Sequence, residues 1–416
     1  MSAVLVLTSS VGQAQPAEPP PAAAPAPAET PAPAVVTPSQ GAIPSEVPAT
    51  APAAPPPPPA PPPPAVPLAT DPPPPPPPPP SKEVKDARKS PMTMNAWLRL
   101  GTHLQGFKDP EKLDRLSQDG ELDLLINAEV LPMVGLTGNL VGSFGPNGTG
   151  GAITGDVNIM DLIARFDFDD AFHLWAGRML VGSDRTNQSG PWFIAPWFYP
   201  GFFAPNAPPL GPHQGPNGRN DGFQVWGQAA GGLFKYYAGM FQLFDTANAP
   251  LFSGRLTLSL INPEPGFYGN SQYYGKKDVL GIGIGAQVQK NGGGDEDYTE
   301  FNADILFEKN LSGAGVLDIE GAFYKYTGEP QQVELSYFAL ASFLIAAPVG
   351  PGRLQPLVRV QQAKPEDGDA DTWTLVDAQV GYVVDDFACR FALGYQYQDV
   401  LGQKGNQIFL GIQLQK

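Results

Sequence analysis

Two strand-like segments lie in FACRFALGYQYQDVLGQKGNQIFLGIQLQ, the stretch from Phe387 to Gln415. Apolar and aromatic side chains alternate there with small or polar ones, first over Phe387–Gln398 and again over Gln407–Gln415. A period of two is typical of a strand with one apolar face and one polar face. Each segment has roughly ten residues, the length that a tilted strand needs to cross a bilayer. We therefore expect this hairpin to repeat around a closed outer-membrane barrel.

The same alternation recurs from Met94 to the C-terminus in about 16 segments. Tight links such as Asp169-Asp170 and Asp385-Asp386 follow even-numbered segments, whereas longer polar links tend to follow odd-numbered ones. Outer-membrane barrels show this asymmetry, with short periplasmic turns and long outer loops. The link Ile261–Asp278 departs from it, because it is long yet follows an even-numbered segment. The predicted fold is an all-β transmembrane antiparallel β-barrel of about 16 strands with both termini in the periplasm.

The overall composition excludes several classes of protein. The chain has 416 residues, a formal net charge of −16 and a single cysteine. The acidic balance argues against nucleic acid as a partner, and Cys389 alone cannot form an intrachain disulfide. The longest apolar run, Tyr337–Ala347, is shorter than the roughly 20 residues of a membrane-spanning helix. Membrane residence would therefore require a closed barrel.

Three regions divide the chain. Residues 1–14 are interpreted as the end of a secretory signal, with Gly12-Gln13-Ala14 as the small-x-small cleavage pattern; a random apolar N-terminus is the alternative. Residues 15–93 are rich in Pro and Ala and predict a disordered periplasmic linker, which could act as a spacer or bind a periplasmic or cell-wall partner. Residues 94–416 are the predicted barrel in the outer-membrane lipid.

The longest connection, residues 181–222, contains SGPWFIAPWFYPGFFAPNAPP. A loop of this length in a compact barrel is expected to fold onto something. Folding into the lumen would bury its aromatic side chains and narrow the pore. The alternative is an aromatic cap that packs on a neighbouring subunit or on the barrel rim.

Two runs carry a family resemblance. LWAGRMLVGSDRTNQSGPWFIAPWFYPGFF (Leu174–Phe203) with GRNDGFQVWG (Gly218–Gly227), and GFYGNSQYYGKKDVLGIGIGAQ (Gly266–Gln287), resemble porins of the phosphate-selective porin O and P superfamily. The resemblance implies a 16-stranded barrel, usually a homotrimer, with a loop that constricts the pore. Phosphate selectivity does not carry over, because the dense set of internal Arg and Lys residues cannot be mapped onto this chain.

Charged and aromatic side chains in or beside the long loop are the candidates for the pore constriction. Each could equally be a hydrogen-bonded loop anchor. They are Arg178, Asp184, Arg185, Trp192, Trp197, Arg219 and Asp221.

Charged side chains on the strands are the candidates for the lumen wall. Residues 90–416 hold 21 basic and 35 acidic side chains, which favours a weak or cation-leaning ion preference. The alternative is that many of them form structural ion pairs. The candidates are Arg99, Asp123, Glu129, Arg165, Lys235, Arg255, Glu300, Asp304, Asp318, Glu320, Arg359, Asp377 and Arg390.

Enzymatic chemistry finds little support in the sequence. The histidines His103, His173 and His213 belong to no recognised catalytic motif, and no metal or cofactor motif is present. We therefore predict a porin, not an enzyme, for passive diffusion of small hydrophilic solutes or ions. The alternatives are a structural, surface-anchoring barrel with a plugged lumen and an outer-membrane hydrolase.

Overall fold

The computed structural model describes residues 92–106, 113–146, 153–200, 218–242, 249–291, 296–328, 333–368, 371–400 and 402–416. The predicted signal remnant and all but the last two residues of the Pro-rich segment 15–93 lie outside these ranges. Residues 201–217 of the long loop, which include His213, lie outside them as well.

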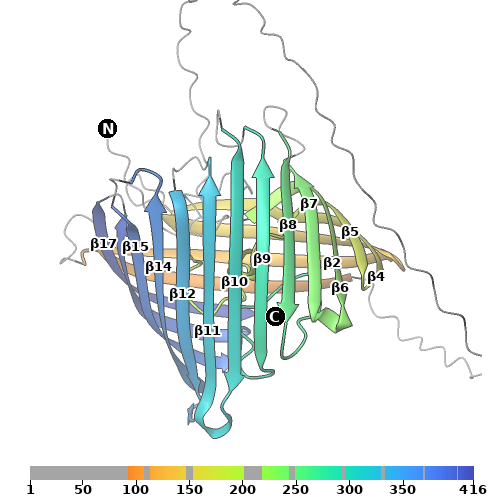
Figure 1. The fold of residues 1–416 in the computed structure, drawn as a ribbon. Coiled ribbons are helices and arrows are strands. Elements are labelled where there is room, and N and C mark those ends of the chain that lie inside the picture. The colour runs from red at the N-terminus through yellow and green to blue at the C-terminus, as the bar shows by residue number, and fades with distance from the viewer. Residues whose placement is uncertain are drawn as a thin grey trace, which may run out of the picture. The chain divides into compact units, whose positions relative to one another are not determined.

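Antiparallel strands form most of the described chain (Figure 1). The long ones are β1 (Met92–Gly106), β2 (Arg115–Leu131), β3 (Val134–Pro146), β4 (Ile153–Asp169), β5 (Phe172–Leu180), β6 (Arg219–Ala229), β7 (Phe234–Phe241), β8 (Leu251–Ser259), β9 (Val279–Gln289), β10 (Tyr298–Asn310), β11 (Gly315–Thr327), β12 (Val333–Ile345), β14 (Gly352–Pro365), β15 (Trp373–Asp385), β16 (Cys389–Val400) and β17 (Gln403–Gln415). The two-residue β13 (Pro348–Val349) pairs only with β14. Within the described residues the one α-helix is α1 (Arg185–Ser189).

The sheet closes on itself. Each long strand pairs with the next along the chain, and β1 pairs with β17 from Trp97↔Gln415 to Gly106↔Asn406. Closure satisfies the backbone hydrogen bonds of both strands that would otherwise be edges. The predicted closed barrel of about 16 strands is confirmed.

The two faces of the barrel wall are the reverse of those of a soluble protein. On β9, Ile282, Ile284 and Val288 point outward and are 39–45% exposed, whereas Gln287 and Gln289 point inward and are buried. The same alternation gives β17 its exposed row of Ile408, Leu410 and Leu414. Apolar side chains outside and polar side chains inside are what a barrel in lipid requires.

Connections differ between the two ends of the barrel. The end with residues 132–133, 170–171, 230–233 and 386–388 has mostly short turns and is called the short-turn end below. The connection between β8 and β9 lies at this end, yet it runs from Leu260 to Asp278. β8 and β9 pair directly, so this link is one long connection and conceals no missing hairpin. No described helix is long and apolar enough to cross a membrane.

Candidate functional site in the barrel lumen

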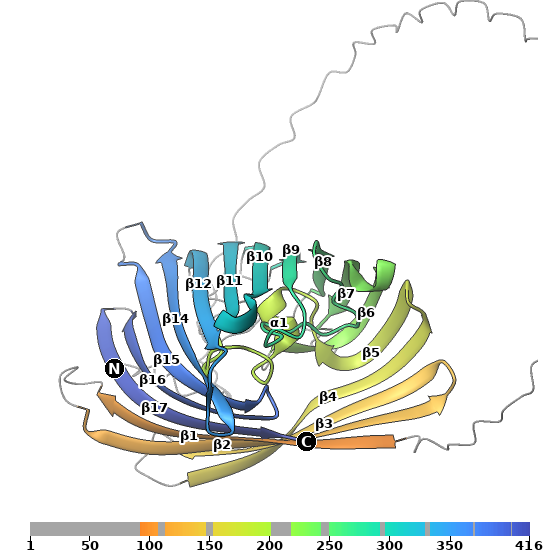
Figure 2. The same ribbon diagram turned by 90° about the horizontal axis from the view of Figure 1, so that it is seen from below.

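Two connections fold into the barrel from opposite ends. The first is the β5–β6 loop, described from Val181 to Pro200, which contains α1 inside the ring of strands (Figure 2). The second, called the β8–β9 segment here, is Leu260–Asp278. The two meet through backbone hydrogen bonds, from Ser271 N to the Phe193 carbonyl at 2.9 Å and from Gly269 N to the Gln188 carbonyl at 3.3 Å. The lumen is therefore narrowed from both ends.

The β5–β6 loop begins with a tightly held helical turn. Asp184 caps α1 by accepting a hydrogen bond from the backbone N–H of Asn187, and it also accepts from the hydroxyls of Ser183 and Tyr324. Burial raises the pKa of Asp184, while the charge of Arg255 and the hydroxyl donors oppose that rise. Because Asp184 is fully buried, it anchors the loop and borders no open passage.

Arg185 joins the two inward connections. Its two terminal nitrogens each donate a hydrogen bond to a different oxygen of the Glu264 carboxylate, both at 2.8 Å. Arg185 Nη1 also donates to the Asn270 carbonyl at 3.0 Å. Asp304 on β10 lies 3.8 Å from Arg185 Nε and also binds Arg255 of β8 at 2.6 and 3.0 Å. Burial favours the neutral form of Arg185, but Glu264 outweighs it and raises the pKa of Arg185. This buried network fixes α1 against the wall.

Three wall arginines hold the rest of the loop by its backbone carbonyls. Arg99 of β1 donates to Pro191 O at 3.0 Å and also to Trp197 O. Arg390 of β16 donates to Ile194 O at 2.7 Å and Ala195 O at 3.1 Å, and Arg359 of β14 to Phe198 O at 2.9 Å. Charge-assisted hydrogen bonds of this kind are the strong ones. Arg99, Arg359 and Arg390, which were predicted to face the lumen, therefore hold the loop against the barrel wall.

The loop tryptophans pack against side chains of β1 and β2. Trp192 donates from Nε1 to Asp123 of β2 at 3.1 Å and lies 5.6 Å from the Trp97 ring. Trp197 lies beneath the Arg99 guanidinium at 4.3 Å. Both side chains are buried, so they hold the loop across the lumen and leave little of their own surface to a solute.

The remaining predicted wall charges fall into two groups. Lys235, Arg255, Glu300, Asp304, Asp318, Glu320 and Asp377 face inward and are at most 5% exposed. On the other side of the lumen, Arg165 and Asp167 of β4 are 22% and 33% exposed. Tyr268 of the β8–β9 segment is 45% exposed and lies 6.2 Å from the Trp175 ring of β5. Among the described residues, these accessible side chains lie beside β4 and β5.

The structure corrects the expected positions of three candidates. Arg178 and Asp221 form an ion pair at 2.7 Å, but the ladder places Arg178 opposite the outward-facing Leu162 and Asp221 on the face of Phe223. This pair therefore lies on the outer face of the wall. Glu129 lies at the exposed end of β2 at the short turns. Arg219, in contrast, pairs with the buried Asp161 of β4 at 3.2 Å.

Sequence reasoning missed the β8–β9 segment as a part of the lumen. Glu264 and Tyr268 lie in the lumen, where Arg178 and Asp221 were expected. The available signal was the length of Ile261–Asp278 at a position where a short turn was expected, together with its aromatic and amide side chains.

Comparisons with solved structures support the fold. OprB of Pseudomonas putida at high pH aligns with a TM-score of 0.57 and 10% identity, over 78% of this chain and 94% of that chain. A loop L8 deletion mutant of OmpT, an outer membrane protein of Vibrio cholerae, aligns with a TM-score of 0.51 and 16% identity, over 78% and 100%. A mutant of the Rh. blastica porin was also matched, with a TM-score of 0.46 and 12% identity, over 78% and 100%.

The chain shares the barrel fold of OprB and OmpT. At identities this low the likeness shows the fold alone. No protein-family model and no curated protein matches the chain. The resemblance to phosphate-selective porins is therefore not confirmed by these comparisons.

Proposed function

We propose that this chain is an outer-membrane porin that lets small hydrophilic solutes or ions diffuse passively across the membrane. The observation that carries the proposal is the inverted barrel wall, apolar outside and polar inside, with two connections fastened across its lumen. A polar inner face is shared by open channels and plugged barrels, so conductance is the property that distinguishes the two.

The passage that we propose runs beside β4 and β5. Tyr268 borders it from the β8–β9 segment, and Arg165 and Asp167 border it from the wall. Arg165 and Asp167 lie 3.7 Å apart, so their fields largely cancel. The acidic surplus of residues 90–416 then gives the pore a weak preference for cations.

Electrical recording tests the function directly. The purified full-length chain, inserted in planar bilayers, is expected to produce stepwise increases in conductance. Under a KCl gradient it is expected to give a small reversal potential whose sign indicates a preference for cations. Folded protein without conductance would reject the porin proposal.

The extensive burial of the lumen side chains of β8 to β15 favours a second candidate, a plugged barrel with a structural role. In that case the Pro-rich arm would contact cell-wall material. Absence of conductance together with co-sedimentation of the chain with cell-wall fragments would support this candidate.

Assembly and sidedness belong to the same proposal. The family resemblance supports a homotrimer, and the even number of long strands places both ends of the barrel chain at the short-turn end, which we assign to the periplasm. Chemical cross-linking tests the trimer. Protease treatment of intact cells, which should spare the Pro-rich arm, tests the sidedness.

A further inference from the structure

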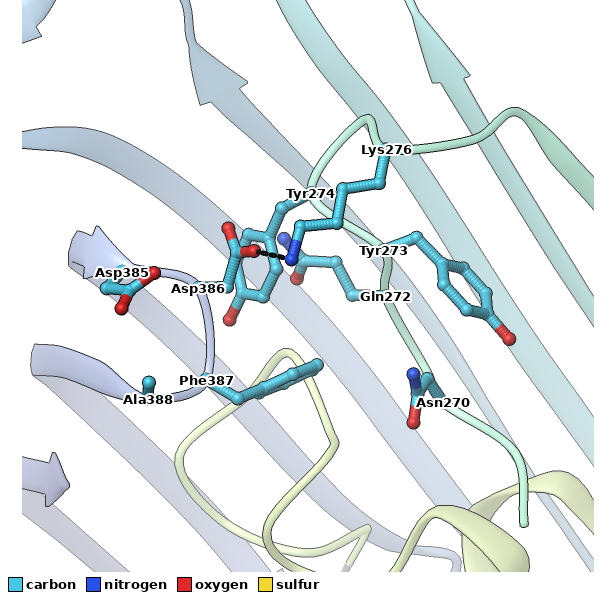
Figure 3. Close-up of a pocket in the computed structure, with 9 residues that line it drawn as sticks. All are labelled: Asn270, Gln272, Tyr273, Tyr274, Lys276, Asp385, Asp386, Phe387 and Ala388. Atoms are coloured by element: carbon cyan, nitrogen blue, oxygen red, sulfur yellow. Dashed lines mark ion pairs between the residues drawn. The ribbon is translucent and has the colours of Figure 1, made fainter. Parts of the chain in front are cut away.

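A pair of opposite charges on the inner face of β4 is open to the lumen. Arg165 and Asp167 lie two residues apart on that face, and their side chains are 22% and 33% exposed. The distance from Arg165 Nη1 to Asp167 Oδ2 is 3.7 Å, which is longer than a hydrogen bond. At the cavity shown in Figure 3, by contrast, Lys276 and Asp386 lie 2.5 Å apart and satisfy each other. The pair on β4 therefore keeps polar atoms that a solute can reach.

Arg165 is the positive half of this pair. Its guanidinium lies over Gly135 of β3, where a Cβ atom would come within 2.5 Å of Arg165 Nη2. Arg165 donates no hydrogen bond to any described residue. Its Nε is buried, whereas its two terminal nitrogens reach solvent. These terminal nitrogens can donate charge-assisted hydrogen bonds to a carboxylate in the lumen.

Asp167 is the negative half, and its orientation is fixed. Its Oδ1 accepts hydrogen bonds from His173 Nδ1 at 2.9 Å and from Trp175 Nε1 at 3.0 Å, both on β5. The His173 ring is in turn stacked on the Trp226 ring of β6 at 3.9 Å. Oδ2 accepts no hydrogen bond from the described residues. It can therefore accept one from a cationic group of a solute.

An aromatic surface borders the charge pair. Trp175 lies opposite Arg165 in the β4–β5 ladder, and the Tyr268 ring of the β8–β9 segment lies 6.2 Å from the Trp175 ring. Tyr268 is 45% exposed, and the Phe267 ring supports it at 5.0 Å. A rigid aromatic ring offers a large apolar contact at a small cost in conformational entropy. An apolar group of a solute that binds the charge pair can lie against Tyr268.

The two charges select a solute that carries both signs. Asp167 repels a simple anion, and Arg165 repels a simple cation. An α-amino acid carries its ammonium group and its carboxylate next to each other, so its two charges can lie antiparallel to those of the wall. Each charge then meets its opposite across a charge-assisted hydrogen bond. A neutral solute gains neither ion pair.

We propose that this charge pair is a binding site for a zwitterionic α-amino acid with an apolar side chain, whose carboxylate accepts from Arg165 and whose ammonium group donates to Asp167. The site rests on the proposed porin function, because it names a solute class for the passage beside β4 and β5. Arg165, Asp167 and Tyr268 border that passage, so a bound amino acid obstructs the ions that use it. Binding also makes the flux of the amino acid saturable.

The test uses L-phenylalanine, added to either side of planar bilayers that contain the conducting full-length channel. It is expected to reduce the ion current reversibly and saturably. Two related compounds each lack one charge: phenylpropanoate has no ammonium group, and phenethylamine has no carboxylate. Both are expected to need about tenfold higher concentrations, because each loses one charge-assisted hydrogen bond.

Asp167→Asn removes one charge of the site and keeps its hydrogen bonds, because the asparagine oxygen can still accept from His173 and Trp175. It should raise the half-saturating concentration of L-phenylalanine about tenfold and should not raise that of phenylpropanoate. Arg165→Gln should raise the value for L-phenylalanine by a similar factor and should not raise that of phenethylamine.

Asp399→Asn is the matched control. Asp399 is 31% exposed and lies 3.7 Å from Lys404, so this pair resembles the one on β4 in separation and accessibility. It lies near the end of β16, at the end of the barrel opposite the short turns. The exchange should leave the response to L-phenylalanine unchanged.

Three outcomes would overturn the amino-acid site and leave the porin proposal standing. The first is a conducting channel whose current L-phenylalanine does not reduce. The second is a reduction that neither Asp167→Asn nor Arg165→Gln weakens. The third is an equal reduction by all three compounds, since contact with the aromatic ring would then suffice. A folded protein without conductance overturns the porin proposal itself.

Discussion

Glu264 stays ionised inside the barrel because Arg185 faces both of its carboxylate oxygens. Burial alone would raise its pKa, but the Arg185 charge, together with hydrogen bonds from Arg185 and Tyr273, holds the pKa of Glu264 well below its usual value of 4.5. The side chains of Arg185 and Glu264 are 5% and 4% exposed, so each charge is compensated by the other and not by water. Removing one partner of a buried pair costs about 3–5 kcal/mol, because the other charge is left uncompensated.

This linkage predicts how stability depends on pH. The unfolded carboxyl titrates near 4.5 and the folded one at a lower pH, so the contribution of Glu264 is complete above pH 4.5 and is lost as the pH falls toward the folded pKa. Glu264→Gln should therefore lower the free energy of unfolding by about 3 kcal/mol at neutral pH. That difference should stay constant down to about pH 5 and shrink in stronger acid.

Urea unfolding of both proteins in the same detergent measures this difference. Glu334→Gln is a suitable control, since Glu334 forms its ion pairs with Lys325 and Lys364 at partly exposed positions and should contribute little. A Glu264 effect that grows on acidification would contradict the assignment of an ionised, Arg185-paired carboxylate.

At the scale of elements, the β5–β6 loop held by the wall arginines is the feature that would set the pore width under the proposed porin function. Arg390 makes two hydrogen bonds to loop carbonyls, each worth about 1.5–3 kcal/mol because the donor is charged. Arg390→Ala should therefore loosen the loop, raise single-channel conductance and speed proteolytic cleavage within residues 191–200. Lys364→Ala removes another cationic side chain, one that pairs with Glu334 of β12, and should change neither property. Unchanged conductance in Arg390→Ala would show that the loop does not limit the pore.

The elements themselves were largely predictable from sequence, because alternation is a local property. Phe387–Gln398 and Gln407–Gln415 predict β16 and β17 within a few residues. The inward path of the β8–β9 segment was not predictable, because it depends on Arg185 and Glu264, which lie 79 residues apart. Arg178 shows a different failure. Its position in the alternation puts it with the outward-facing Phe172, and the expectation that a charge must face the lumen overrode that pattern.

At the scale of the whole molecule, polar and apolar surfaces are exchanged between inside and outside. The mean hydropathy of the whole chain, with its Pro-rich segment, is only −0.17, and nearly half of the strand positions face the lumen. Overall hydropathy therefore conceals the membrane character, and only the order of residues reveals it. The exposed apolar side chains on successive strands form one continuous outer surface. In lipid this surface is stable, whereas in water it would drive aggregation.

Two leucine-sized side chains on or beside β10 test which part of that surface meets lipid. Ile305 in the middle of the strand and Leu311 just past its end are both 43% exposed, so they differ in depth and not in accessibility. An arginine in the lipid midplane costs about 2–4 kcal/mol and near the interface about 0–1 kcal/mol. Ile305→Arg should thus lower the free energy of folding into lipid vesicles by the larger amount, and Leu311→Arg by little. Equal effects of the two substitutions would mean that this face of the barrel is not embedded in a bilayer, and the transport proposal would fail with it.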